Sequence, residues 1–226
     1  MTAPLHGTAS AATDTAASVA QAIRDYRDPA RVRYLKLADG GLTDNQGLAS
    51  ILVARVLSGT PHGPLTEADA VRLRRMLFLI VDAGRAPAGD WVLRPEGPGG
   101  LDVGIAAADA AIVSATRLST TAFRYMARRW QQDLVRFRCG LDEARVHALV
   151  PAGERCACDD LQVVVETISP ESLPPERAAS LRAMPTRLTL STAQVDEAIA
   201  AGRDAARASP ALRAHIASRL TSALGH

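Results

Sequence analysis

The chain has 226 residues, of which 47% are hydrophobic and 4% aromatic, and its 26 basic and 24 acidic residues give a formal net charge of +2. This length predicts one sizeable domain rather than two. The balanced charge and the few aromatic side chains available for base stacking argue against nucleic acid as a partner. No window approaches about 18 uninterrupted apolar residues, so no transmembrane segment is expected.

The first part of the chain predicts a helix, a strand and a second helix. The first helix is expected over residues 16–26, and the strand over 32–38. The second helix is expected over 47–57, with Asn45 capping its start and Ser58-Gly59 ending it.

A third helix and a buried strand are expected next. Thr66 is placed to cap the helix, with Asp69 as its acidic partner in a capping box. Residues 76–81 form a continuous apolar run, which is typical of a strand buried on both faces. Because a helical crossover separates them, the strands over 32–38 and 76–81 are predicted to be neighbours in one mostly parallel sheet.

The middle of the chain contains a long loop and a long helix. Residues 84–100 are rich in Gly, Pro and Ala, which fits either a segment that covers a site or binds a partner, or a solvated insertion. Residues 102–138 carry an apolar stripe at helical spacing, more typical of a core than of a lipid pocket. The stripe consists of Phe123, Met126, Trp130, Leu134 and Phe137. Arginines expected on the far side fit a solvated face or a peripheral contact with anionic membrane headgroups. They are Arg124, Arg128, Arg129, Arg136 and Arg138.

The C-terminal part predicts one more strand and two more helices. The strand is expected over 161–168, and four prolines between 170 and 185 predict an irregular segment after it. Helices are then expected from Ser191 to Gly202, and from Ser209-Pro210 to Leu224.

This alternation of helices and strands predicts an α/β fold with a mostly parallel sheet between helical layers. We expect a single domain over 1–226. Its parts are a leading helix and connection over 1–31, an α/β body over 32–205 and a tail helix over 206–226.

The three cysteines, Cys139, Cys156 and Cys158, lie close together in the sequence. Their odd number leaves open a disulfide from Cys139 to one of the other two, or ordinary reduced thiols. His147 is the only histidine between them, so a zinc site is disfavoured, and neither a metal nor another cofactor is expected. Cys139 is expected near Cys156 or Cys158, because the long helix ends at Gly140 and the chain must turn back towards the sheet.

The location of the protein stays open. The first 20 residues mix Ala, Thr and Ser without a basic start or a leucine-rich core, so no secretory signal is visible in this chain. A disulfide would imply export, and the parent protein could be exported or membrane-associated.

The most informative motif is Asp39-Gly40-Gly41, which directly follows the predicted strand over 32–38. Glycines adopt backbone angles closed to other residues, so the turn can direct the Asp39 carboxylate into a cleft. A carboxylate placed in this way suits a general base. By itself, the motif also fits an ordinary turn, since Asp and Gly dominate turns.

Residues 34–48, including Asp44, Asn45 and Gly47, resemble the Asp-Gly-Gly block of the patatin-like phospholipases. These are α/β lipid acyl hydrolases in which a strand-end aspartate pairs with a serine on a Gly-x-Ser-x-Gly elbow. The resemblance implies that Asp39 is the base of a Ser-Asp dyad and that the substrate is a lipid or another ester. It makes Asp44 and Asn45 candidates for holding the turn through side-chain to backbone hydrogen bonds, or for simple helix capping.

Weaker similarity to the same family continues through 76–84, 101–139 and 181–202, so most of the chain resembles the family's C-terminal portion. The sequence departs from the family because no glycine has a serine two positions after it, and no Gly-Gly-x-x-Arg-Gly oxyanion loop is present. The resemblance therefore implies an incomplete domain that contributes the aspartate and is inactive alone. The alternative is a truncated or degenerate remnant without catalysis, or a binding module.

Overall fold

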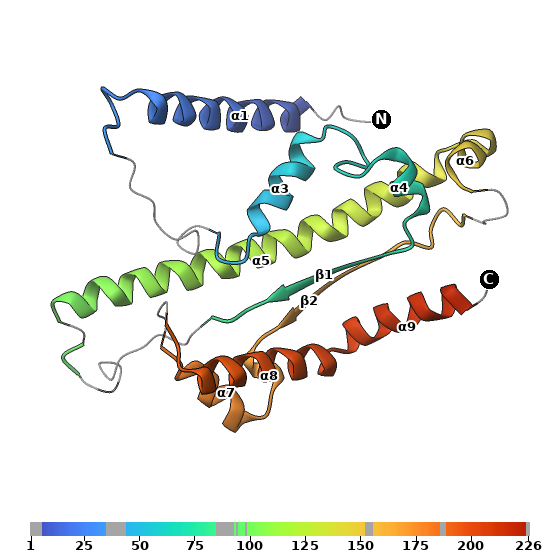
Figure 1. Ribbon diagram of the computed structural model, residues 1–226. Helices are drawn as coiled ribbons and strands as arrows, with labels where there is room; N and C mark the ends of the chain where they lie inside the picture. The colour runs from blue at the N-terminus through green and yellow to red at the C-terminus, as the bar shows by residue number, and fades with distance from the viewer. Residues whose placement is uncertain are drawn as a thin grey trace.

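Two parallel strands lie between helices in this computed structural model (Figure 1). The model describes residues 6–34, 44–84, 93, 95–97, 99–151, 156–185 and 189–224. Strands β1 (Arg75–Val81) and β2 (Gln162–Ile168) are covered on one face by α5 (Leu101–Cys139) and α3 (Leu48–Leu57). On the other face they contact α9 (Pro210–Leu224). This is the mixed helix and strand arrangement expected from the sequence, with a sheet too small to identify one α/β family.

The remaining elements lie around these layers. They are α1 (His6–Arg27), α4 (Glu67–Arg72), α6 (Glu143–Leu149), η2 (Pro170–Ser172), α7 (Pro175–Arg182) and α8 (Thr192–Ala208). None of the helices in the described ranges is long and apolar enough to cross a membrane.

The two strands pair in parallel, with Arg75 opposite Gln162 and Val81 opposite Ile168. The strand expected over 76–81 from its apolar run and the strand expected over 161–168 from weak alternation are both confirmed. Within the described ranges the sheet contains no third strand. Residues 32–34 of the strand predicted over 32–38 are not in a strand, and residues 35–38 lie outside these ranges, so the expected place of that strand beside β1 stays a prediction.

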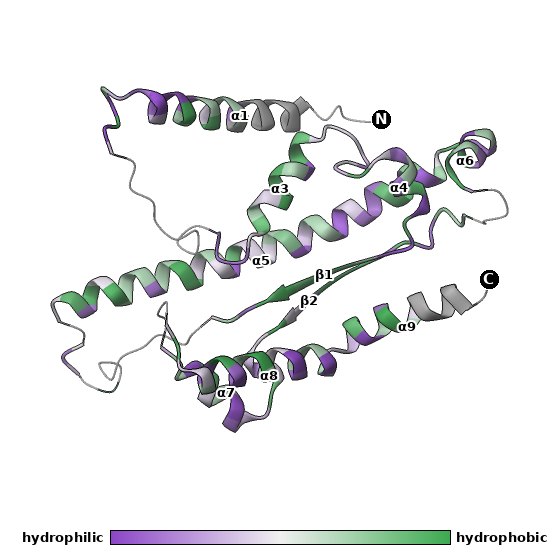
Figure 2. Ribbon diagram, viewed as in Figure 1, coloured by the Kyte–Doolittle hydropathy of each residue, from purple (hydrophilic) through white to green (hydrophobic). Residues whose placement is uncertain are grey.

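Alternate residues of the strands point to opposite faces, as strand geometry requires. Phe78 and Ile80 of β1 pack towards α5, where the ring of Phe78 meets that of Phe123 edge-on with centroids 4.9 Å apart. Trp130 and Leu134 continue this core along the helix. The predicted core role of the α5 stripe is therefore confirmed. The strand β1, against which it packs, is hydrophobic along most of its length (Figure 2).

A buried serine joins α9 to the opposite face of the sheet. Ser209 precedes α9, and its hydroxyl accepts the Leu212 N–H at 3.2 Å and donates to Glu166 of β2 at 3.3 Å. Ser209 is 4% exposed, so this polar side chain is buried with both of its contacts made inside the protein. The predicted start of the tail helix is confirmed.

Local capping signals placed several helix ends correctly. The Thr66 hydroxyl accepts the Asp69 N–H at 3.1 Å, and Ser191 forms a capping box with Gln194. The expectation of an irregular segment after β2 was wrong. Helix α7 begins at Pro175, because proline is well suited to a first helical turn, where its missing N–H costs no hydrogen bond.

Candidate functional site

The Asp-Gly-Gly motif lies outside the described residues, since Asp39, Gly40 and Gly41 fall within 35–43. The predicted strand-end position of Asp39, the backbone angles of the two glycines and the direction of the carboxylate therefore stay predictions. The described part of the resembling block begins at Asp44.

Asp44 fixes the start of α3. Its two carboxylate oxygens accept the N–H groups of Leu48 and Ala49, each at 2.9 Å. Its backbone carbonyl accepts the Gly47 N–H at 3.1 Å. The first amides of a helix have no partner inside the helix, and a negative charge is favourable at this end. Asp44 thus makes the side-chain to backbone hydrogen bonds that were expected of Asp44 and Asn45 together. Asn45, which was also expected to cap this helix, is exposed.

Gly47 closes this turn in the left-handed region, with φ of +67°. An added Cβ would meet nothing within 4 Å, so the backbone angle, rather than crowding, favours glycine here. The next residue, Leu48, is 5% exposed and packs with Ile80 and Phe123. Because Ile80 is near the end of β1, the turn is anchored close to the carboxyl end of that strand. Ligands of open parallel α/β sheets bind at this end of the strands.

A second contact ties the same turn to α5. The Thr120 hydroxyl donates to the side-chain oxygen of Gln46 at 2.6 Å, and both residues are half-buried. The turn is therefore held by the core through Leu48 and by a hydrogen bond through Gln46. The resemblance had drawn attention to Asp44, Asn45 and Gly47 and had missed Gln46.

Asp82 is a strand-end aspartate that the sequence analysis did not propose for the site. It follows β1, its N–H donates to the Ile168 carbonyl at 2.9 Å, and its Oδ1 accepts the Gly84 N–H at 2.8 Å. The sequence contained a signal for this strand-end aspartate, because the apolar run before Asp82-Ala83-Gly84 resembles the local pattern around Asp39. Asp82 uses its carboxylate to close a turn, which makes it a natural control for Asp39.

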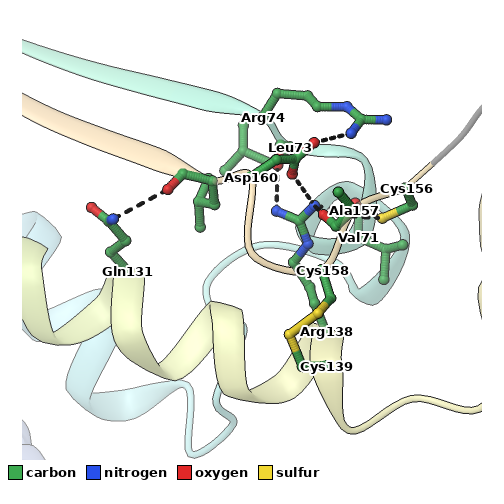
Figure 3. A network of polar contacts seen from close by, with 11 residues as sticks. Val71, Leu73, Arg74, Gln131, Arg138, Cys139, Cys156, Ala157, Cys158 and Asp160 are labelled. Carbon is green, nitrogen blue, oxygen red and sulfur yellow. Dashed lines mark hydrogen bonds and ion pairs between the residues drawn. A yellow bond between two sulfur atoms is a disulfide. The ribbon is translucent and has the colours of Figure 1, made fainter.

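A second polar cluster joins the end of α5 to the segment before β2 (Figure 3). Arg138 is 2% exposed and donates to the carbonyls of Leu73 at 2.9 Å and Ala157 at 2.6 Å. It also pairs with Asp160, whose other carboxylate oxygen pairs with Arg74. Among the described residues, the Arg138 Nε finds no hydrogen-bond partner.

The predicted arginine face of α5 was therefore wrong in part. Arg138 lies four residues after Leu134 on the core side of the helix, where distant carbonyls and Asp160 neutralise it. Arg124 is half-buried and donates to the Thr167 hydroxyl at 3.0 Å. The other members of the predicted face, Arg128, Arg129 and Arg136, are exposed.

The cysteines lie beside this cluster. Cys139 and Cys158 form a disulfide with Cα atoms 4.9 Å apart, which confirms the predicted approach of these segments. Cys156 keeps a thiol, whose sulfur is 3.3 Å from the Val71 carbonyl oxygen and 3.5 Å from an Arg138 Nη atom. In the described ranges, no group of three or more His, Cys, Asp or Glu side chains is arranged to hold a metal.

Glu171 has a strongly lowered pKa and lies away from both the Asp44 turn and the Arg138 cluster. Arg182 donates a hydrogen bond that lowers the pKa of Glu171 to about 2, and Ser169 adds a second one. Glu171 is exposed on η2, and this pair links η2 to α7. The shift therefore reflects a surface ion pair rather than a catalytic environment.

No protein-family model, curated protein or solved structure matches this chain. The fold defines a protein of mixed helix and strand with a parallel strand pair. The Asp39-Gly40-Gly41 motif and the turn that follows it are therefore the features that bear on function.

Proposed function

We propose that this chain is the C-terminal part of a patatin-like lipid acyl hydrolase and supplies Asp39 as the base of a Ser-Asp dyad. The observation that carries the proposal is the Asp39-Gly40-Gly41 motif followed by the turn from Asp44 to Gly47. A serine hydroxyl must lose its proton as it attacks an ester carbonyl, so a base within hydrogen-bond reach is required. In a dyad the aspartate takes this role without an intervening histidine.

The geometry of the turn supports this proposal. A catalytic carboxylate needs a rigid neighbouring backbone, because small displacements of reacting groups reduce the rate. The chain after the motif has such a backbone, since Asp44 binds two helix amides and Leu48 is buried against Ile80. The same anchoring holds the turn close to the carboxyl end of β1.

The size of the sheet supports an incomplete domain. Parallel strands normally occur in sheets with more strands, and an isolated pair is marginal in stability. Among the described residues, β1 and β2 each pair on one edge only. Additional strands, in a segment that carries the serine and the oxyanion donors, would complete such a sheet.

A peripheral contact with a lipid surface is part of the proposal. On α5, Leu118 is 72% and Tyr125 is 73% exposed, and Arg128 is exposed one turn beyond Tyr125. Apolar and tyrosine side chains beside a cation suit the boundary between headgroups and acyl chains. Arg129 and Arg136 both pair with Asp133, which reduces the charge they offer to headgroups.

The test compares the 226-residue chain with a polypeptide extended upstream in the same reading frame to include a Gly-x-Ser-x-Gly segment. Both are assayed for p-nitrophenyl ester hydrolysis and for labelling by a fluorophosphonate, which reacts with activated serines. We expect the short chain to be inactive and unlabelled, because it lacks the nucleophile, and loss of the oxyanion donors alone costs roughly 10²-fold in rate. The extended polypeptide should turn over the ester and carry the label.

Two results would overturn the proposal. Turnover with serine labelling by the short chain would show that it contains its own nucleophile. A stop codon, a frameshift or the lack of a Gly-x-Ser-x-Gly segment upstream would favour a non-catalytic remnant or a binding module.

A further inference from the structure

We propose that Cys156 is an exchange thiol for the Cys139–Cys158 disulfide, so that the bridge can pass from Cys158 to Cys156. This inference is independent of the proposed hydrolase activity. It starts from three sulfur atoms gathered at one end of the molecule, two of them bridged and one a thiol (Figure 3).

Arg138 brings the thiol and the bridge together. It directly precedes Cys139 in α5, and its Nη2 atom contacts both the Cys156 sulfur and the Ala157 carbonyl. Ala157 lies between Cys156 and Cys158, so the segment carrying both possible partners is fixed next to Cys139. Arg138 also supplies positive charge beside the sulfur that becomes negative when exchange begins.

A short displacement of residues 156–158 separates the Cys139–Cys158 bridge from a Cys139–Cys156 bridge. One residue lies between Cys156 and Cys158, which limits their Cα separation to about 7 Å. Because the Cα atoms of Cys139 and Cys158 are 4.9 Å apart, Cys156 lies within about 12 Å of Cys139 by Cα distance. A bridge requires about 7 Å or less, so a shift of at most a few ångströms allows the second pairing.

The exchange balances without an added oxidant or reductant. Cys156 gives its proton to solvent and its thiolate attacks the Cys139 sulfur. A bond forms between Cys139 and Cys156, the bond between Cys139 and Cys158 breaks, and Cys158 leaves as a thiolate that takes up a proton. One disulfide and one thiol are present before and after the step.

The Arg138–Asp160 ion pair controls the equilibrium between the two bridges. Asp160 lies two residues beyond Cys158 and directly before Leu161, which is buried in the core, so it holds the segment in the arrangement with Cys139–Cys158 bridged. Moving Cys156 to Cys139 requires this ion pair and the Cys156–Val71 contact to break. The pairing state is therefore coupled to the position of the segment that leads into β2.

The test locates the free thiol in the intact chain. The protein is equilibrated anaerobically at pH 8, given a brief pulse of N-ethylmaleimide and digested with pepsin in acid, where disulfides do not rearrange. Fragmentation between Cys156 and Cys158 in the mass spectrometer assigns the label. We expect label on both residues, with the remaining disulfide joining Cys139 to the unlabelled one. Label confined to Cys156 in the native chain would overturn the proposal.

Two aspartate variants test whether the Arg138–Asp160 ion pair controls the equilibrium between the two disulfides. Asp160→Asn should raise the ratio of label on Cys158 to label on Cys156 roughly tenfold, since it weakens a charged hydrogen bond that holds the native pairing. Asp159→Asn changes an exposed neighbouring aspartate and should leave this ratio unchanged. Equal ratios in the two variants would show that Arg138–Asp160 does not govern the exchange. Circular dichroism of each variant ensures that the label reports a folded chain.

Discussion

The two halves of α5 belong to one continuous helix but differ in what surrounds them (Figures 1 and 2). From residue 101 to 120 no side chain is buried, and Leu101 and Leu118 are 81% and 72% exposed. From Phe123 onward the helix buries its stripe against the strands, and the buried Arg138 is the residue before its last one. The apolar stripe that predicted a core lies wholly in the second half, although both halves are helical. Helix formation and burial are therefore separate properties, since burial depends on which other segments cover the helix.

The largest effect should come from Arg138. Arg138→Met removes the buried guanidinium that donates to the Leu73 and Ala157 carbonyls and pairs with Asp160, so we expect the free energy of unfolding to fall by about 3–5 kcal/mol. Urea denaturation measures this change. Arg136→Met, on an exposed position two residues earlier, should change it by no more than about 0.5 kcal/mol. Similar losses in both variants would remove the distinction between core and surface at this end of α5.

A matched pair of leucines compares the two halves directly. Leu134 is fully buried, so Leu134→Ala should destabilise the protein by about 2–5 kcal/mol through lost burial and the cavity that remains. Leu118→Ala should change stability by about 0.5 kcal/mol or less in the isolated chain. A large loss at Leu118 would indicate that the first half of α5 is covered in solution, for instance by a second copy, and sedimentation would detect it.

The disulfide should stabilise the C-terminal end of α5 by about 2–4 kcal/mol, because it restricts the unfolded chain across a sequence separation of 19. A lower melting temperature in the presence of a phosphine reductant measures this contribution. Cys156→Ser is the control, since it leaves the bridge in place and should melt close to the native chain. An unchanged melting temperature on full reduction would mean that Arg138 and the core hold this end without the bridge.

The smallest expected effect concerns the turn that packs beside Phe123, where the buried half of α5 begins. Asp44→Ala removes the acceptor for two amides of α3 and should cost about 1 kcal/mol. Asn45→Ala should cost less, because the cap is made by Asp44. Urea denaturation of the two variants orders them, and a larger loss at Asn45 would reverse the assignment of the cap.

The parts of the fold that follow from local chemistry were predicted from the sequence. An apolar run identified β1, weak alternation identified β2, and periodicity identified α5. Thr66 and Ser191 marked helix starts through their side-chain caps. These signals need only neighbouring residues, so they can be recognised in a single sequence. Asp44 and Asn45 were both candidates for holding the turn, and the sequence did not choose between them, because the choice depends on the left-handed turn at Gly47.

Features that depend on distant segments were not predicted. Nothing near Arg138 in the sequence identifies Leu73, Ala157 and Asp160 as its partners, so its burial was not expected. The pairing of β1 with β2 likewise joins strands separated by the whole of α5. Three cysteines left the pairing open until the Cα separation of Cys139 and Cys158 selected one bridge. The candidate base, Asp39, belongs to a three-residue motif that falls wholly outside the described ranges.

The most direct test of the central claim compares two strand-end aspartates in the upstream-extended polypeptide. Asp39→Asn should lower kcat for p-nitrophenyl ester hydrolysis by roughly 10²-fold or more, the contribution typical of a general base. Asp82→Asn should keep most of the activity, because the Asp82 carboxylate closes a turn with Gly84. Full activity in Asp39→Asn would contradict the account, and loss of activity in Asp82→Asn alone would move the base to the end of β1.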